Sequence, residues 1–129
     1  MKEPLWIETH DATVLHERLL AAHGGAAGIR DEALLKSALS RPRHHFAYAD
    51  KVDVVEMASL YTTGIVRNHP FVDGNKRTGF VVGVLFLELN GYCFTASEEE
   101  SVRFVRDLAA GTLDEAACAA FLRENVVAE

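Results

Sequence analysis

Residues 69–78 read HPFVDGNKRT and lie between two long segments with helical spacing. The segment before them, residues 53–68, is expected to end at His69-Pro70, because proline disfavours helical backbone in the residue that precedes it. The segment after them begins near Asn75 and runs to Asn90-Gly91, a pair typical of helix C-termini. Residues 79–87 include no charged side chain, so we expect this second helix to be buried on both faces at the centre of the fold.

The rest of the chain also reads as helices. A first helix is expected to end at Gly24-Gly25, and a second to begin after Asp31, a good N-cap, and to end before Pro42. Two more helices close the chain, each opened by a capping box: Ser97 with Glu100, and Thr112 with Glu115. The predicted fold class is therefore all-α, a compact bundle of about six helices around a buried central helix.

Two local features refine this prediction. Gly79 and Gly83 are four residues apart, which lets a neighbouring helix approach closely. Residues 44–52 leave two interpretations open, because Phe46 and Tyr48 alternate with alanines in a weakly strand-like way. They form either a short β-hairpin or a plain loop.

Length, composition and charge exclude several classes of protein. The 129 residues are 49% hydrophobic and 25% charged, as in an ordinary globular protein, and fit a single domain over residues 1–129. A formal net charge of −6 argues against direct nucleic-acid binding, so an anion must be held by a local positive site. The chain shows no signal peptide, and its most apolar run is too short to span a bilayer, so we expect a cytoplasmic protein. In that reducing compartment Cys93 and Cys118 are expected to be free.

Residues 69–78 combine groups that suit phosphate chemistry. Asp73-Gly74 is expected to form a tight turn, and the free N–H groups of the following helix attract anions. Lys76 and Arg77 add two cations in the first helical turn, where the helix dipole disfavours them unless an anion binds. Asp73 suits Mg²⁺ as an oxygen ligand, and His69 is able to take a proton near neutral pH. These residues indicate phosphoryl or nucleotidyl transfer, although a plain connection between helices with solvated cations would read the same.

Residues 69–77 resemble the HPFxDGNKR form of the Fic/Doc motif. The resemblance extends over about residues 10–92, where several short stretches are similar to the N-terminal half of death-on-curing (Doc) toxins. These stretches are Leu15-His16, Gly24-Gly25, Gly28-Ile29-Arg30-Asp31, Leu34-Leu35, and Ala38 through Pro42. The resemblance implies the Fic/Doc fold, with Phe71 in a structural role.

Two positions separate this sequence from the commoner Fic pattern, HPFxxGNGRxxR. Lys76 stands where that pattern has glycine, and Phe80 stands where it has its last arginine. A lysine side chain would fill space that an incoming triphosphate uses, and loss of the arginine removes a phosphate contact. Doc proteins share both changes, bind ATP in the reversed sense, and transfer its γ-phosphate to a protein hydroxyl.

The resemblance therefore implies a Doc-type toxin of a toxin–antitoxin pair, an ATP-dependent protein Ser/Thr kinase. Its target would be a translation factor, elongation factor Tu in that family, and the outcome would be arrested translation. His69 would be the catalytic base, Asp73 the Mg²⁺ ligand, and Gly74, Asn75, Lys76 and Arg77 would hold the phosphates of ATP. The alternatives are an adenylyltransferase that moves AMP to a protein hydroxyl, and a non-catalytic binding or regulatory module.

Further expectations concern regulation and the surroundings of the loop. Fic proteins are commonly silenced by a helix of pattern [S/T]xxxE[G/N], which is not found here; residues 120–125 come closest but carry alanine at the first position. A Phd-like antitoxin is therefore expected as a separate chain. Residues 44–53 correspond to the flap that pairs with an extended target peptide in this family. Arg67 either faces the loop or is a solvated cation, and His10, His16 and His23 are expected at the surface or as caps.

Overall fold

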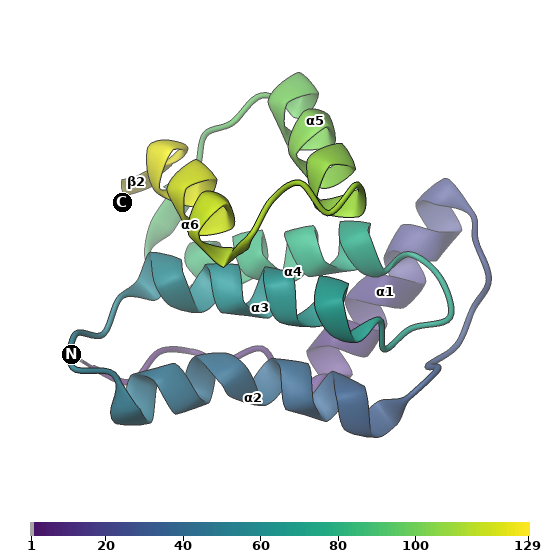
Figure 1. Ribbon diagram of the computed structural model, residues 1–129, viewed down its shortest axis with the longest axis horizontal. Helices are drawn as coiled ribbons and strands as arrows, with labels where there is room; N and C mark the ends of the chain where they lie inside the picture. The colour runs from purple at the N-terminus through teal and green to yellow at the C-terminus, as the bar shows by residue number, and fades with distance from the viewer. Residues whose placement is uncertain (1) are drawn as a thin grey trace.

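The computed structural model describes residues 2–129 as a helical protein with one small sheet (Figure 1). The elements are, in chain order, α1 (Thr9–His23), α2 (Glu32–Tyr48), α3 (Val54–Asn68), α4 (Asn75–Leu89), β1 (Tyr92–Phe94), α5 (Glu98–Ala109), α6 (Glu115–Glu124) and β2 (Val126–Ala128). The two strands pair antiparallel, with Cys93 opposite Val127. The predicted all-α class with about six helices is confirmed. Within residues 2–129, every helix lacks the combination of length and apolar composition that crossing a membrane requires.

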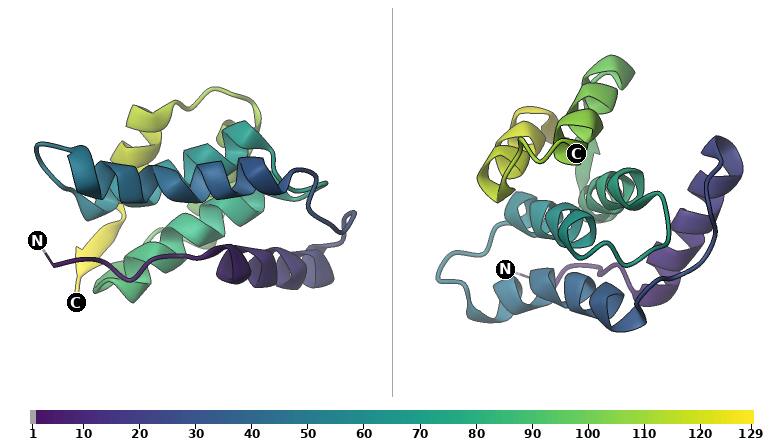
Figure 2. Two further views of the ribbon diagram at one scale, coloured as in Figure 1. Left: turned by 90° about the horizontal axis from the view of Figure 1, so that it is seen from below. Right: turned by 45° about the vertical axis from the view of Figure 1, so that its right-hand side comes forward.

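Helix α3 lies at the centre, with α2 on one side, α4 on the other and α6 across it (Figures 1 and 2). From Val54 to Ile65 every residue except Glu56 is buried. Helix α4 was expected to hold this central position, and that prediction was wrong. Its side away from α3 is covered only partly by α1 and α5, so Val81, Val84 and Leu85 are half-exposed. The uncharged residues 79–87 of α4 are therefore buried or half-buried, but the helix does not lie at the centre of the fold.

Two glycines of α4 bring it close to α3, as their spacing predicted. A Cβ atom added at Gly79 would lie 2.9 Å from the carbonyl oxygen of Thr62. One added at Gly83 would collide with the Thr62 hydroxyl and lie 3.0 Å from the Ala58 carbonyl oxygen. The Thr62 hydroxyl also donates a hydrogen bond of 2.8 Å to the Gly79 carbonyl. The α3–α4 pair is therefore in close backbone contact, with no room for a methyl group at Gly83.

Helix α2 continues through Pro42 to Tyr48, which corrects two predictions. The helix does not end before Pro42, and residues 44–48 are helical and lead into a loop at 49–53, so neither a hairpin nor a flap strand forms there. Proline leaves the carbonyl four residues earlier, that of Ala38, without its helical partner. Ala38 packs against Gly64 of α3, close enough that a Cβ atom there would lie 3.4 Å from the Ala38 carbonyl oxygen. Burial of the Pro42 ring against the core offsets the lost hydrogen bond.

Two of the three caps predicted from the sequence are confirmed. Asp31 caps α2, and Ser97 forms its capping box with Glu100, while Asp53, which was not predicted as a cap, caps α3. The box expected between Thr112 and Glu115 is wrong, because Asp114 directly precedes α6 and its carboxylate accepts the Ala117 N–H at 2.8 Å. The Thr112 hydroxyl instead donates to the Asp107 carbonyl near the end of α5. Cys93 and Cys118 are both free, as predicted.

Candidate active site

The loop of residues 69–74 joins α3 to α4 beside the C-terminal half of α1 (Figure 1). His69 ends α3: its N–H donates to the Ile65 carbonyl at 3.0 Å, and its backbone is left-handed, with φ 52° and ψ 52°. Among residues 2–129 it is the sole non-glycine residue with positive φ. This conformation costs an L-residue about 1 kcal/mol or more, so neighbouring contacts must hold it. The His69 side chain is exposed.

Residues 28–31 run alongside the loop and bind its main chain. The Val72 N–H donates to the Gly28 carbonyl at 3.0 Å, and the N–H groups of Arg30 and Asp31 donate to the Pro70 carbonyl at 2.7 and 3.0 Å. An isolated antiparallel bridge pairs residues 29 and 71 between these bonds. The segment between α1 and α2 is therefore the support on which the loop lies.

Two buried side chains fix the loop from within. Phe71 is fully buried, in the structural role expected of it. Asn75 is 3% exposed, and its amide accepts the Phe71 N–H and donates to the Phe71 carbonyl, both at 2.9 Å. Because the Asn75 side chain already forms these two hydrogen bonds, only the backbone N–H of Asn75 is left for the phosphate binding predicted for this residue.

His16 of α1 contacts the loop at two points and was missed as a site residue. It is 2% exposed, so the prediction of a surface or capping position is wrong. Its ring stacks on Phe71 with centroids 3.9 Å apart, and its Nε2 lies 2.7 Å from the Asp73 carbonyl oxygen, to which it donates as an N–H. The signal in the sequence was the spacing of Ala12 and His16, one helical turn apart on the buried face of α1.

Asp73 lies at the turn with both carboxylate oxygens in use. Oδ2 accepts the Ala26 N–H at 3.2 Å, and Oδ1 accepts the Gly74 N–H at 2.8 Å. These two bonds, that of Ala26 first, lower the pKa of the carboxyl below its usual 3.8, so the exposed group is ionised at neutral pH. Residues 2–129 contain no group of three His, Cys, Asp or Glu side chains placed to hold a metal. A lone carboxylate fits Mg²⁺ that takes its other ligands from phosphate and water.

The predicted site residues open into one cleft of about 210 Å³. The cleft is lined by His69, Asp73, Gly74, Asn75, Lys76, Arg77 and, from α5, Val105. Val105 could not be found from the sequence, since nothing in α5 marks the residue that reaches the loop. Every residue proposed for catalysis, metal binding or phosphate binding thus faces the same space.

The N-terminal turn of α4 is the most positive part of this cleft. The first helical hydrogen bond runs from the Thr78 N–H to the Gly74 carbonyl, which leaves the N–H groups of Asn75, Lys76 and Arg77 unused by the helix. The ion pairs found in residues 2–129 include neither Lys76 nor Arg77, and both side chains are exposed. Two unpaired cations at the positive end of a helix dipole make a site for an anion.

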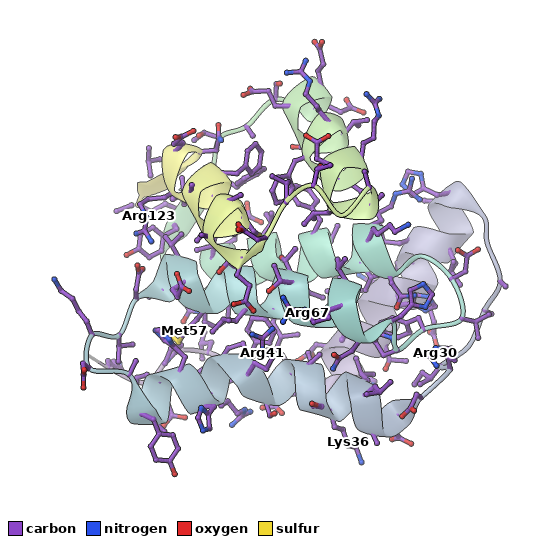
Figure 3. The ribbon with its side chains drawn as sticks, in the orientation of Figure 1. Arg30, Lys36, Arg41, Met57, Arg67 and Arg123 are labelled. Atoms are coloured by element: carbon purple, nitrogen blue, oxygen red, sulfur yellow. The ribbon has the colours of Figure 1, made fainter. Side chains whose placement is uncertain are left out.

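Arg67 and Phe80 are not part of this cleft. Arg67 lies 3.7 Å from Glu115 of α6, beside Arg41, so of the two roles left open it has that of a surface cation (Figure 3). Phe80 is half-buried in an aromatic cluster, with its ring centroid 5.7 Å from those of Phe94 and Phe104. The position where Fic proteins carry a phosphate-binding arginine is here used for packing α4 against β1 and α5.

Comparison with known proteins shows a family relationship that includes the loop and most of α4. A model of the Fic/DOC family matches residues 6–87, from before α1 into the last turns of α4. "Protein kinase doc" of Escherichia phage P1 is 31% identical over 85 residues, which cover 66% of this chain and 68% of that protein. "Toxin Doc" of Mycolicibacterium smegmatis is 37% identical over 71 residues, 54% of this chain and 55% of that protein. The chain thus spans just over half of the mycobacterial relative's length.

Proposed function

The chain belongs to the Fic/DOC family, and from that premise we propose that it is a Doc-type toxin that transfers the γ-phosphate of ATP to a Ser or Thr hydroxyl of another protein. One observation carries the proposal: a histidine, a carboxylate and a cationic helix N-terminus line a single cleft. The name of one relative, a protein kinase, supports the activity, and the name of the other, a toxin, supports the toxin role.

Three parts of the cleft would bind the nucleotide. The N–H groups at the start of α4 and the side chains of Lys76 and Arg77 would hold its phosphates. Asp73 would hold Mg²⁺, which supplies further neutralisation of phosphate charge during transfer. Gly74, the N-cap of α4, has φ 77° and ψ 18°, a left-handed conformation that glycine adopts without strain, and it would join the phosphate site through its place at the start of the helix.

His69 would act as the general base. It accepts the proton of the target hydroxyl as that oxygen forms its bond to the γ-phosphorus, while the bond from phosphorus to the β–γ bridging oxygen breaks and ADP leaves. Its exposed ring faces the same cleft as the start of α4, which brings the proton acceptor and the phosphate site together. General-base catalysis of this kind contributes about 10²- to 10⁴-fold in rate.

Lys76 and Phe80 favour transfer of the γ-phosphate over transfer of AMP. Lys76 lines the cleft where the Fic pattern has a glycine, and Phe80 is packed in the aromatic cluster. Incubation with ATP labelled at the α- or the γ-position separates the two reactions. Label carried from the γ-position to the target supports the kinase, and label retained from the α-position would establish the adenylyltransferase instead.

The target we propose is elongation factor Tu, with arrested translation as the outcome and a Phd-like antitoxin supplied by a separate chain as the inhibitor. The test is phosphorylation of purified elongation factor Tu, with the modified residue located by mass spectrometry. His69→Ala is the matched variant, and we expect it to be harmless when expressed. Growth inhibition by His69→Ala equal to that of the wild type would favour a non-catalytic binding module.

A further inference from the structure

We propose that Arg30 is a positioning residue for His69, whose guanidinium holds the histidine in the conformation from which it meets the target hydroxyl. The residue lies outside the 69–78 loop, in the segment between α1 and α2 (Figure 3). The catalytic consequence rests on the proposed function, whereas the conformational consequence can be measured without it.

The contacts of Arg30 all go to the main chain at the end of α3. Its Nε donates to the His69 carbonyl at 2.7 Å, and its terminal nitrogen donates to the Asn68 carbonyl at 3.0 Å. Its own backbone N–H donates to the next carbonyl, that of Pro70, at 2.7 Å. One residue therefore binds three successive carbonyls, the middle one belonging to the histidine.

The end of α3 needs such a partner. The last carbonyls of a helix have no N–H donor within the helix, and they carry the negative end of its dipole. A guanidinium donates hydrogen bonds to these carbonyls, and its positive charge interacts favourably with the dipole. The left-handed backbone of His69 is unfavourable for an L-residue, and no glycine supplies it here. Fixing the direction of the His69 carbonyl fixes its ψ angle, and with it the direction in which the side chain leaves the backbone.

Arg30 is itself held in place from α2. The adjacent Asp31 caps that helix by accepting the Leu34 N–H at 3.0 Å, and Asn68 donates to the Leu34 carbonyl at 3.0 Å. Both Arg30 and the end of α3 that it binds are thus connected to the start of α2, the first through Asp31 and the second through Asn68. The ion pairs within residues 2–129 do not include Arg30, although its side chain is exposed. Its role is to shape the backbone and not to pair with a carboxylate.

The test compares Arg30→Ala and Arg30→Lys with Arg103→Ala, a control that removes an exposed arginine whose partner is Glu99 one turn away. In the first arm, NMR follows the φ-dependent coupling, the backbone shifts and the ring signals of His69 in each full-length variant. We expect the His69 signals to shift in Arg30→Ala, to shift less in Arg30→Lys, and to stay unchanged in the control. Unchanged His69 signals in Arg30→Ala overturn the proposal.

The second arm is kinetic. We expect kcat of phosphate transfer to fall about 10- to 100-fold in Arg30→Ala, with KM for ATP within about twofold of the wild type because the α4 terminus is untouched. A rise in KM with kcat unchanged contradicts positioning. If Arg30→Ala does not fold, the NMR and kinetic measurements are made on Arg30→Lys. His69 signals and a kcat equal to those of the wild type in that variant overturn the proposal. A wild-type protein that transfers no phosphate refutes the proposed function, and the NMR arm then decides the position of His69.

Discussion

Two sets of side chains alternate along residues 69–78, and they differ in what surrounds them. Pro70, Phe71, Asn75 and Thr78 are buried, while His69, Val72, Asp73, Lys76 and Arg77 are exposed. The buried set binds the loop to itself and to α1, whereas the exposed set includes the unpaired groups of the cleft. One short stretch thus separates the residues that keep its shape from those available to a ligand, and the two sets should respond differently to mutation.

The largest expected effect is a loss of stability when a side chain of the buried set is removed. Phe71→Ala removes a fully buried ring and its stacking on His16, and we expect the free energy of unfolding to fall by about 3–5 kcal/mol. Urea denaturation followed by circular dichroism measures this. Val72→Ala, at the exposed neighbouring position, is the control and should stay within about 0.5 kcal/mol of the wild type. Equal losses in both would contradict the division into two sets.

Asn75→Ala should have the next largest effect. It removes both hydrogen bonds to Phe71 and leaves a buried N–H and carbonyl without partners, at a cost of about 2 kcal/mol or more. Phosphate transfer should fall as well, because the loop loses its shape. Thermal unfolding and the labelled-ATP assay measure the two effects. A variant that lost activity at wild-type stability would assign the Asn75 side chain to the ligand rather than to the loop.

Lys76→Glu is expected to change activity and stability in opposite directions. The substitution replaces a cation by an anion at a helix N-terminus, which should stabilise the protein by about 0.3–1 kcal/mol. Because an anion then replaces the cation that we propose stabilises the transferred phosphate, kcat/KM should fall about 10²-fold. Melting temperature and phosphate transfer are measured on the same preparation. A destabilised Lys76→Glu protein would show that Lys76 supports the fold although its side chain is exposed.

The smallest effect concerns Asp73 and acid. Because the folded pKa of this carboxyl lies below 3.8, the ionised group stabilises the fold above that pH, and the contribution is lost as the pH falls through the folded pKa. Asp73→Asn should therefore have a lower urea midpoint than the wild type at pH 7, and this difference should shrink toward pH 3. A difference that grew on acidification would show that the Ala26 and Gly74 N–H groups do not favour the charged form.

Most of the cleft could be anticipated from the sequence because, apart from Val105, its lining residues fall within residues 69–77. A stretch that ends one helix and starts the next keeps its members within a few ångströms whatever the rest of the fold does, so His69, Asp73 and Lys76 had to meet. The helices were predictable for the same reason, through local caps such as Asp31 and Ser97.

What sequence reasoning missed depends on contacts between distant segments. His16 reads as one histidine among several until α1 is laid against the loop, and Arg30 reads as a turn residue until the end of α3 lies beside it. Pro42 breaks a helix by local rules, yet α2 continues through it and Pro42 is buried. For His16 and Arg30 a partner far away in the chain decided the outcome, and no local pattern encodes that partner.

Gly83 lies about two turns along α4 from the cleft, yet it bears on the shape of the cleft. His69, which we propose as the base, belongs to the end of α3, and the proposed phosphate site belongs to the start of α4, so the gap between them depends on how closely the two helices approach. That approach is set where Gly79 and Gly83 meet Thr62 and Ala58. A methyl group at Gly83 would act as a wedge between the two helices, altering the reach of the base without touching any group in the cleft. The geometry of the cleft therefore depends on a glycine that does not line it.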